Sequence, residues 1–277
     1  MEILYIVVGI VLVLLVLGLW MICPRIFGKP NREPFLGVYY AHRGLFANDS
    51  EAPENSLLAI QKAVEAGYGI EFDVQLTKDE VPVVFHDASL KRMCGVDGKI
   101  WEYTLSELRQ MKLLGSRQTI PTLTEVLKAV DGKVPLIIEY KMDRVDTRVC
   151  ELGNAILETY KGVYCMESFH PFAVRWYRKF RPDVMRGQLS MNHAREGKTA
   201  FTYKLVSNLL TNFLARPDFI AYCHEDADRF ALKLCRRLGA LAVAWTIRSQ
   251  AQYENVKTQF DLFIFDSFRL GQNEKGE

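Results

Sequence analysis

Two apolar segments carry charged side chains two residues apart. In residues 69–74, Glu71 and Asp73 alternate with apolar residues, and Glu139 and Lys141 have the same spacing further along the chain. Side chains two apart on a strand share a face, so Glu71 and Asp73 converge. Such close carboxylates favour a hard divalent cation between them, magnesium or calcium. For either segment alone, the alternative to a metal site is that these charged side chains make ordinary ion pairs at the rim of a sheet.

Two histidines follow apolar runs and therefore lie where strands would end. His42 follows residues 38–41, and His86 follows residues 81–85. Two histidines at one site can serve as general base and general acid, each contributing about 10²–10⁴ in rate. Arg43 offers a fork of donors that suits a phosphate. A single histidine commonly has only a packing role, so this interpretation depends on the two converging with the carboxylates.

The elements that would position these residues alternate between strand and helix patterns. A ninth apolar run, 81–85, is joined to its predecessor only by Thr77-Lys78-Asp79-Glu80, too short for a parallel crossover, so we expect the strand to extend into an antiparallel hairpin over 69–86. Eight parallel strand–helix units within residues 38–277 predict an α/β fold, the (β/α)8 TIM barrel. The alternative, an open doubly wound sheet, would have a glycine-rich phosphate loop after its first strand. The eight strand-like runs are 38–41, 69–74, 136–140, 163–169, 184–189, 219–222, 241–247 and 262–265.

A series of short motifs from residue 38 onward resembles the glycerophosphodiester phosphodiesterase family. The resemblance is most specific over residues 42–87, where five motifs occur in order at the family's spacing. The motifs are His42-Arg43-Gly44, Pro53-Glu54-Asn55-Ser56, Gly67 to Glu71 with Asp73, Thr77-Lys78-Asp79, Val83-Val84-Phe85-His86-Asp87, Glu139-Tyr140-Lys141, Ser168-Phe169 and Trp245-Thr246.

The resemblance implies a reaction and a set of residue roles. It implies that one divalent cation, Mg or Ca, is bound and that a glycerophosphodiester is split into glycerol 3-phosphate and an alcohol. The implied nucleophile is the glycerol 2-hydroxyl, with water opening a cyclic phosphate afterwards; direct attack by water is the alternative. The implied roles are metal binding by Glu71, Asp73 and Glu139, acid–base catalysis by His42 and His86, phosphate contact by Arg43 and Lys141, and pocket lining by Trp245.

The end of the last strand departs from the family pattern. The family usually has Thr-Asp followed by proline there, whereas this chain has Phe265-Asp266-Ser267-Phe268. The identity of the leaving alcohol therefore stays open. Lysophospholipids, cleaved as by a lysophospholipase D, are an alternative substrate. A catalytically silent barrel that binds a lipid headgroup or a partner is the alternative of another class. Because every implied acid–base and metal position is occupied, an enzyme is favoured.

The first residues predict a membrane anchor. Residues 3–22 are uncharged and long enough to cross a bilayer as a helix. Glu2 before this run and Trp20-Met21-Ile22 at its end are unlike a cleaved signal peptide. Arg25, Lys29 and Arg32 follow the helix, so the positive-inside rule places the catalytic domain in the cytoplasm of a single-pass membrane protein.

We therefore divide the chain into a transmembrane anchor, 1–23, a linker, 24–37, and the barrel domain, 38–277. The linker contains three prolines and two glycines and, if extended, would span roughly 45 Å. Within the barrel domain, residues 190–216 form a long connection with apolar residues at helical spacing. We expect either an outer barrel helix that packs inward or a helix that contacts lipid.

Charge and cysteine content narrow the function classes further. The chain carries 35 Lys and Arg against 33 Asp and Glu, and its first 32 residues hold four of these: Glu2, Arg25, Lys29 and Arg32. The remainder is balanced, which argues against a nucleic-acid partner. The six cysteines contain no CxxC pair, which predicts free thiols in a reducing compartment.

Overall fold

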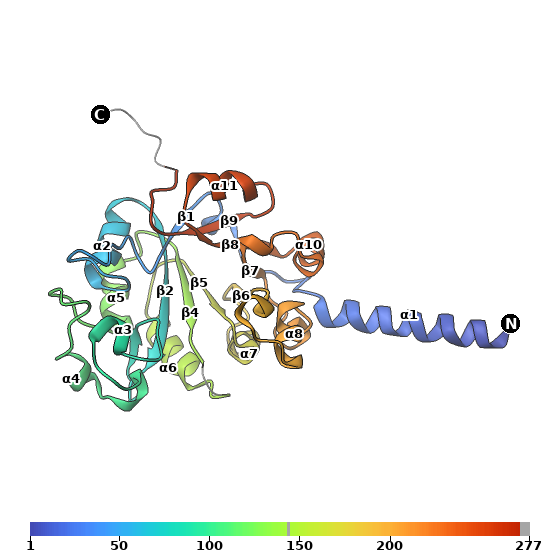
Figure 1. Ribbon diagram of the computed structural model, residues 1–277, viewed down its shortest axis with the longest axis horizontal. Helices are drawn as coiled ribbons and strands as arrows, with labels where there is room; N and C mark the ends of the chain where they lie inside the picture. The colour runs from blue at the N-terminus through green and yellow to red at the C-terminus, as the bar shows by residue number, and fades with distance from the viewer. Residues whose placement is uncertain (143–144, 272–277) are drawn as a thin grey trace.

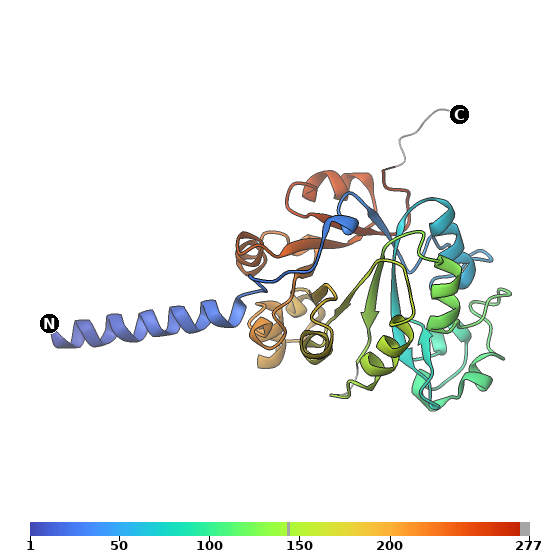
Figure 2. The ribbon, with the colours of Figure 1, turned by 180° about the vertical axis from the view of Figure 1, so that it is seen from behind.

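The computed structural model describes residues 1–142 and 145–271. The C-terminal boundary predicted for the barrel domain, residue 277, lies outside these residues. Figures 1 and 2 show a barrel of strands surrounded by helices, from which one long helix, α1 (Glu2–Ile22), projects. Within the described residues, α1 is the one helix long and apolar enough to cross a membrane.

Eight parallel strands of the described chain close into a barrel, which confirms the predicted fold. Strand β1 (Tyr39–His42) pairs with both β2 (Gly69–Leu76) and β9 (Leu262–Phe265), and this double pairing closes the sheet. Strand β3 (Pro82–Val84) pairs antiparallel with β2, as expected for the hairpin. The other strands are β4 (Leu136–Tyr140), β5 (Tyr164–Ser168), β6 (Arg186–Ser190), β7 (Phe219–Cys223) and β8 (Leu241–Ile247).

Helices cover the outside of the barrel between consecutive strands. Several begin where a hydroxyl side chain accepts a hydrogen bond from the first turn: Ser56 caps α2, Thr122 caps α5 and Ser249 caps α11. The helices after α1 are α2 (Leu57–Glu65), α3 (Lys91–Cys94), α4 (Leu105–Leu108), α5 (Leu123–Val130), α6 (Arg148–Leu157), α7 (Pro171–Phe180), α8 (Phe201–Ser207), α9 (Asn212–Ala215), α10 (Phe230–Arg237) and α11 (Gln250–Val256).

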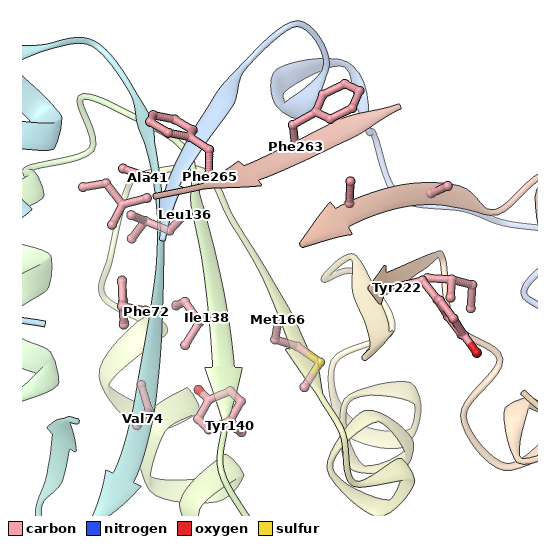
Figure 3. Packing of buried hydrophobic residues seen from close by; sticks show 14 of the residues in the cluster. Ala41, Phe72, Val74, Leu136, Ile138, Tyr140, Met166, Tyr222, Phe263 and Phe265 are labelled. Atoms are coloured by element: carbon pink, nitrogen blue, oxygen red, sulfur yellow. The ribbon is translucent and has the colours of Figure 1, made fainter. Parts of the chain in front are cut away.

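Alternation along the strands divides the core into two layers. Residues such as Phe72 and Val74 of β2 point outward with Ile138 and Tyr140 of β4, as Figure 3 shows, and pack under the helices. The opposite side of each strand fills the barrel interior with a second apolar cluster. Because Glu71, Asp73 and Glu139 occupy the alternate positions, they belong to the interior side.

The segment predicted as a linker is packed along the base of the barrel. Phe35, which is 3% exposed, belongs to the interior cluster, and its carbonyl accepts a hydrogen bond from Tyr40 Oη at 3.1 Å. Arg25 contacts Pro182 and Asp218, and Lys29 donates to the Gly239 carbonyl. Residues 24–37 therefore do not have the reach of an extended linker, because their side chains close the base of the barrel.

The end of α1 is attached to the same base. Arg216, which precedes β7, donates to the carbonyl oxygens of Trp20 and Cys23, both at 2.7 Å, and lies over the Trp20 ring. Phe213 of α9 stacks on Trp20 with ring centroids 4.9 Å apart. Helix α1 thus departs from the end of the barrel where the parallel strands begin.

The long connection 190–216 contains two short helices, α8 and α9. Leu209 lies between them with a φ of +56° and is fully buried, which ends α8 and turns the chain. The expectation of one continuous helix over this connection is therefore wrong. Leu209 packs inward, as expected for an outer barrel helix. Phe201, at the start of α8, is instead 73% exposed.

Candidate active site

Three carboxylates meet inside the barrel at the carboxyl ends of two neighbouring strands. The register pairs Asp73 of β2 with Glu139 of β4, and Glu71 lies two residues before Asp73 on the same side. One oxygen from each of the three side chains lies within 4.8 Å of the others, and all three residues are buried. Oxygen ligands in this number and spacing fit a hard divalent cation.

Two cations border the carboxylates. Lys141 Nζ lies 2.7 Å from Glu139 Oε2 and 3.0 Å from Asp73 Oδ1. Arg43 Nε lies 3.5 Å from Asp73 Oδ2, and its Nη1 donates to Glu54 Oε1 at 2.7 Å. Both cations stand beside the cluster, where they can contact a phosphate bound to it.

The pKa values of Glu71 and Asp73 are shifted in opposite directions. Burial and the neighbouring Asp73, Glu139 and Glu167 hold the pKa of Glu71 well above its ordinary value. Burial also acts on Asp73, but Lys141, His86 and Arg43 outweigh it, so the pKa of Asp73 is well below its ordinary value. A bound divalent cation would lower the pKa of Glu71, since it favours the ionised carboxylate.

His42, the last residue of β1, is held by a carboxylate from the other end of the chain. Its Nδ1 lies 2.8 Å from Asp266 Oδ2, and its Nε2 lies 3.9 Å from Glu71 Oε2. Asp266 also accepts from Arg248 Nε at 3.0 Å. This arrangement leaves Nε2 turned toward the carboxylates. Burial lowers the pKa of His42, and the bond to Asp266 opposes that effect.

His86 is held by its own neighbour. Its Nδ1 lies 2.7 Å from Asp87 Oδ1, and Arg92 Nε donates to the other Asp87 oxygen at 2.6 Å. The amide of Gln75 in β2 donates to the carbonyl oxygens of residues 85, 86 and 87. These bonds fix the loop that carries His86, so both histidines have one ring nitrogen oriented by an aspartate.

The motif Pro53-Glu54-Asn55-Ser56 supports the site from behind. Glu54 is bonded to Arg43 and by two oxygens to Arg92, and Asn55 Nδ2 donates to Asp73 Oδ2 at 2.9 Å. Burial opposes ionisation of Glu54, but Arg92, Arg43 and Asn48 outweigh it and lower its pKa to about 2. The motif thus connects Arg43, beside the carboxylate cluster, to the loop of His86.

Gly44 allows the tight turn that positions Arg43. A Cβ at residue 44 would lie 2.8 Å from the backbone carbon of Ala59 in α2, and its φ of +83° favours glycine. The Arg43 amide donates to the Glu71 carbonyl at 2.8 Å, which ties the turn to β2.

The described residues form a cavity of about 120 Å³ over the site. Trp245, Phe169, Leu189 and Ile264 make an apolar wall opposite the charged residues. The indole N–H of Trp245 has no acceptor within the described part of the chain and so is available to a ligand. The remaining lining residues are His42, Arg43, Glu71, His86, Glu139, Lys141, Glu167, Thr246 and Arg248.

The structure brings every site residue predicted from the sequence to one place. Seven of the eight line the cavity, and the eighth, Asp73, lies beneath them in the carboxylate cluster. Sequence reasoning left four partners without a role: Glu54, Asp87, Asp266 and Glu167. Glu54 and Asp87 were visible as parts of motifs, and Asp266 as the charged residue after the last strand. Glu167 repeats the pattern of Glu139, a carboxylate near the end of an apolar strand.

The fold is a parallel (β/α)8 barrel with buried carboxylates and two aspartate-held histidines in one cavity, and the comparison with known families names its class. The chain belongs to the glycerophosphoryl diester phosphodiesterase family, whose model matches residues 42–268. The match includes all of the predicted site residues.

Individual relatives agree with the family. A glycerophosphodiester phosphodiesterase of Caldanaerobacter subterraneus is 35% identical over 162 residues, which are 54% of this chain and 65% of that protein. The rat lysophospholipase D GDPD1 is 33% identical over 133 residues, 43% of this chain and 41% of that protein. The structure of an Oleispira antarctica phosphodiesterase in complex with the product sn-glycerol-3-phosphate superposes with a TM-score of 0.69 at 25% identity, covering 84% and 94% of the two chains.

Proposed function

We propose that this protein hydrolyses glycerophosphodiesters to glycerol 3-phosphate and an alcohol with the help of one divalent cation. The observation that carries the proposal is the convergence, in one cavity, of a buried carboxylate cluster, two aspartate-held histidines and two cations. Family membership and the product bound by the Oleispira relative support the same reaction.

Glu71, Asp73 and Glu139 would hold the cation, because they supply hard oxygen ligands at a suitable spacing. When bound, it would neutralise charge that develops on the phosphoryl oxygens. Arg43 and Lys141 add donors for the same oxygens. The anionic transition state is thus favoured over the substrate, which carries less charge at phosphorus.

His42 and His86 would move the protons. One histidine takes the proton of the glycerol 2-hydroxyl as its oxygen bonds to phosphorus, and the other protonates the departing alcohol oxygen. Water then opens the cyclic phosphate, with the two proton transfers reversed. Asp266 and Asp87 keep each ring oriented, and direct attack by water remains the alternative route.

Turnover of a panel of glycerophosphodiesters by the full-length protein tests this function. His42→Ala and His86→Ala should each lower kcat by about 10² or more with the fold retained. Near wild-type kcat in either variant would make that histidine structural. A wild-type protein that binds but never cleaves the panel would support the catalytically silent barrel instead.

A lysophospholipid is the second candidate substrate, favoured by a row of aromatic rings. Trp245 meets Phe169 with centroids 5.6 Å apart, Phe169 meets His193 at 6.0 Å, and His193 meets Tyr203 at 5.2 Å. Tyr203 is 39% exposed and ends the row at the surface. This track from the cavity to the surface suits an acyl chain. Tyr203→Asp should then impair cleavage of lysophosphatidylcholine while sparing glycerophosphocholine, and equal effects would exclude the track.

We also propose that residues 1–23 anchor the protein and that the barrel lies in the cytoplasm. Support comes from the length and exposure of α1 and from Arg25, Lys29 and Arg32 after it. The site lies at strand carboxyl ends, whereas α1 leaves from strand starts, so the cavity opens away from the anchor. The cavity would therefore be open to a substrate dissolved in the aqueous phase. Digestion of the barrel by protease added outside intact cells would contradict this sidedness.

A further inference from the structure

Glu167 is a fourth carboxylate inside the barrel for which the proposed reaction has no role. It lies in β5, paired in register with Glu139 of β4 on one side and Gly187 of β6 on the other. Neighbouring strands lie about 4.8 Å apart, so the Glu139 and Glu167 side chains leave adjacent strands on the same face. Both line the cavity together with Glu71.

The carboxylate of Glu167 is buried without a partner. The residue is 1% exposed, and neither of its oxygens accepts a hydrogen bond from any residue that the structure describes. Burying a carboxylate without compensation is costly. The nearby buried carboxylates are compensated: Asp73 by Asn55 and Lys141, and Asp266 by His42 and Arg248. The cationic side chains that line the cavity, Arg43, Lys141 and Arg248, thus leave Glu167 without a bond.

The charge balance of the described site points to the same missing group. Glu71, Asp73, Glu139 and Glu167 are accompanied by two cations, Arg43 and Lys141, and Arg43 is shared with Glu54. If all four carboxylates are ionised, at least two negative charges therefore remain, which one divalent cation would neutralise.

We propose that Glu167 is a fourth carboxylate ligand of the cation site and that it makes the site prefer Ca²⁺ to Mg²⁺. The inference rests on the cation site proposed above. Ca²⁺ takes six to eight oxygen ligands in adaptable geometry, whereas Mg²⁺ keeps several waters and typically binds one or two carboxylates. Four carboxylates that also leave space for a phosphoryl oxygen match the larger ion.

Calorimetric titration of the full-length protein in detergent with Ca²⁺ and with Mg²⁺ tests the preference without an activity readout. Glu167→Gln keeps the shape and removes the charge, and we expect Ca²⁺ affinity to fall about 10- to 100-fold while Mg²⁺ affinity changes less than about threefold. Glu139→Gln is the matched control on the paired strand and should weaken both ions. Gln at residue 167 removes an uncompensated charge, so the cation-free variant should melt no lower than wild type.

Two further measurements separate ligation from a charge effect at a distance. Glu167→Asp keeps the charge but withdraws the oxygens, and it should leave Ca²⁺ affinity as weak as Gln does. The luminescence lifetime of bound Eu³⁺ in H₂O and D₂O should report about one additional coordinated water in Glu167→Gln. Full rescue by Asp, an unchanged water count, or equal losses for Ca²⁺ and Mg²⁺ would overturn the proposal.

Two further outcomes separate failure of this inference from failure of the proposed cation site. Unchanged affinity for both ions together with a raised KM would mean that Glu167 contacts substrate and not the cation, which overturns the inference and leaves the proposed function intact. If the wild-type protein binds neither ion, the cation site itself fails. That failure is visible in the wild type, whereas failure of the inference is visible only in the variants.

Discussion

The bond between His42 and Asp266 allows a prediction that also assigns the catalytic role of His42. Asp266→Asn keeps the size of the side chain but removes the charge that holds Nδ1 at 2.8 Å. A hydrogen bond to a charged group contributes about 1.5–3 kcal/mol, and each 1.36 kcal/mol is tenfold in rate, so kcat/KM should fall by about 10- to 150-fold. A switch of the ring to the other tautomer would add to this loss.

The pH profile gives a readout that a merely structural role would not change. Asp266 raises the pKa of His42 against the effect of burial, so its replacement lowers that pKa further. If His42 is the general base, it stays deprotonated to lower pH, and the acidic limb of kcat/KM moves down. If His42 is the general acid, it loses its proton earlier, and the basic limb moves down instead.

Asp87→Asn is the matched control, because Asp87 holds His86 by an equivalent contact of 2.7 Å. It should lower kcat/KM as well, because it removes the charge that orients the His86 ring. The reasoning is refuted if Asp266→Asn keeps kcat/KM within about threefold of wild type and neither limb moves. Circular dichroism of both variants should show an unchanged fold.

Three further predictions follow from the same contacts. Excess EDTA should abolish turnover, and undiminished activity in chelator would exclude the cation. Glu71→Gln should raise the melting temperature of the cation-free protein at neutral pH, since the raised pKa of Glu71 makes its ionisation destabilising, and should remove stabilisation by added cation. Glu54→Gln should destabilise the protein at pH 7 by at most about 3 kcal/mol, and this difference should vanish on acidification from about pH 5 to about pH 2, because the pKa of Glu54 is lowered to about 2. Urea unfolding across that range measures it, and a difference independent of pH would contradict the ionic origin.

Local sequence was sufficient to predict the faces and ends of the strands. The period-two spacing of Glu71 and Asp73 put both on one side of β2, and the short connection after β2 required the antiparallel hairpin that the structure shows. His42 ends β1 as predicted. These properties depend on strand geometry and connection length, which neighbouring residues determine by themselves.

The partners of these residues depend on closure of the barrel. Asp266 reaches His42 across 224 positions of sequence because β9 returns to pair with β1, and Glu167 joins the carboxylates because β5 pairs in register with β4. The prolines and glycines of residues 24–37 predicted a linker, yet Phe35 fills the base of the barrel. The sequence by itself determined which side chains point inward. Only the tertiary structure decided which of them meet, because contacts between distant strands arise from register and packing and leave no local periodicity.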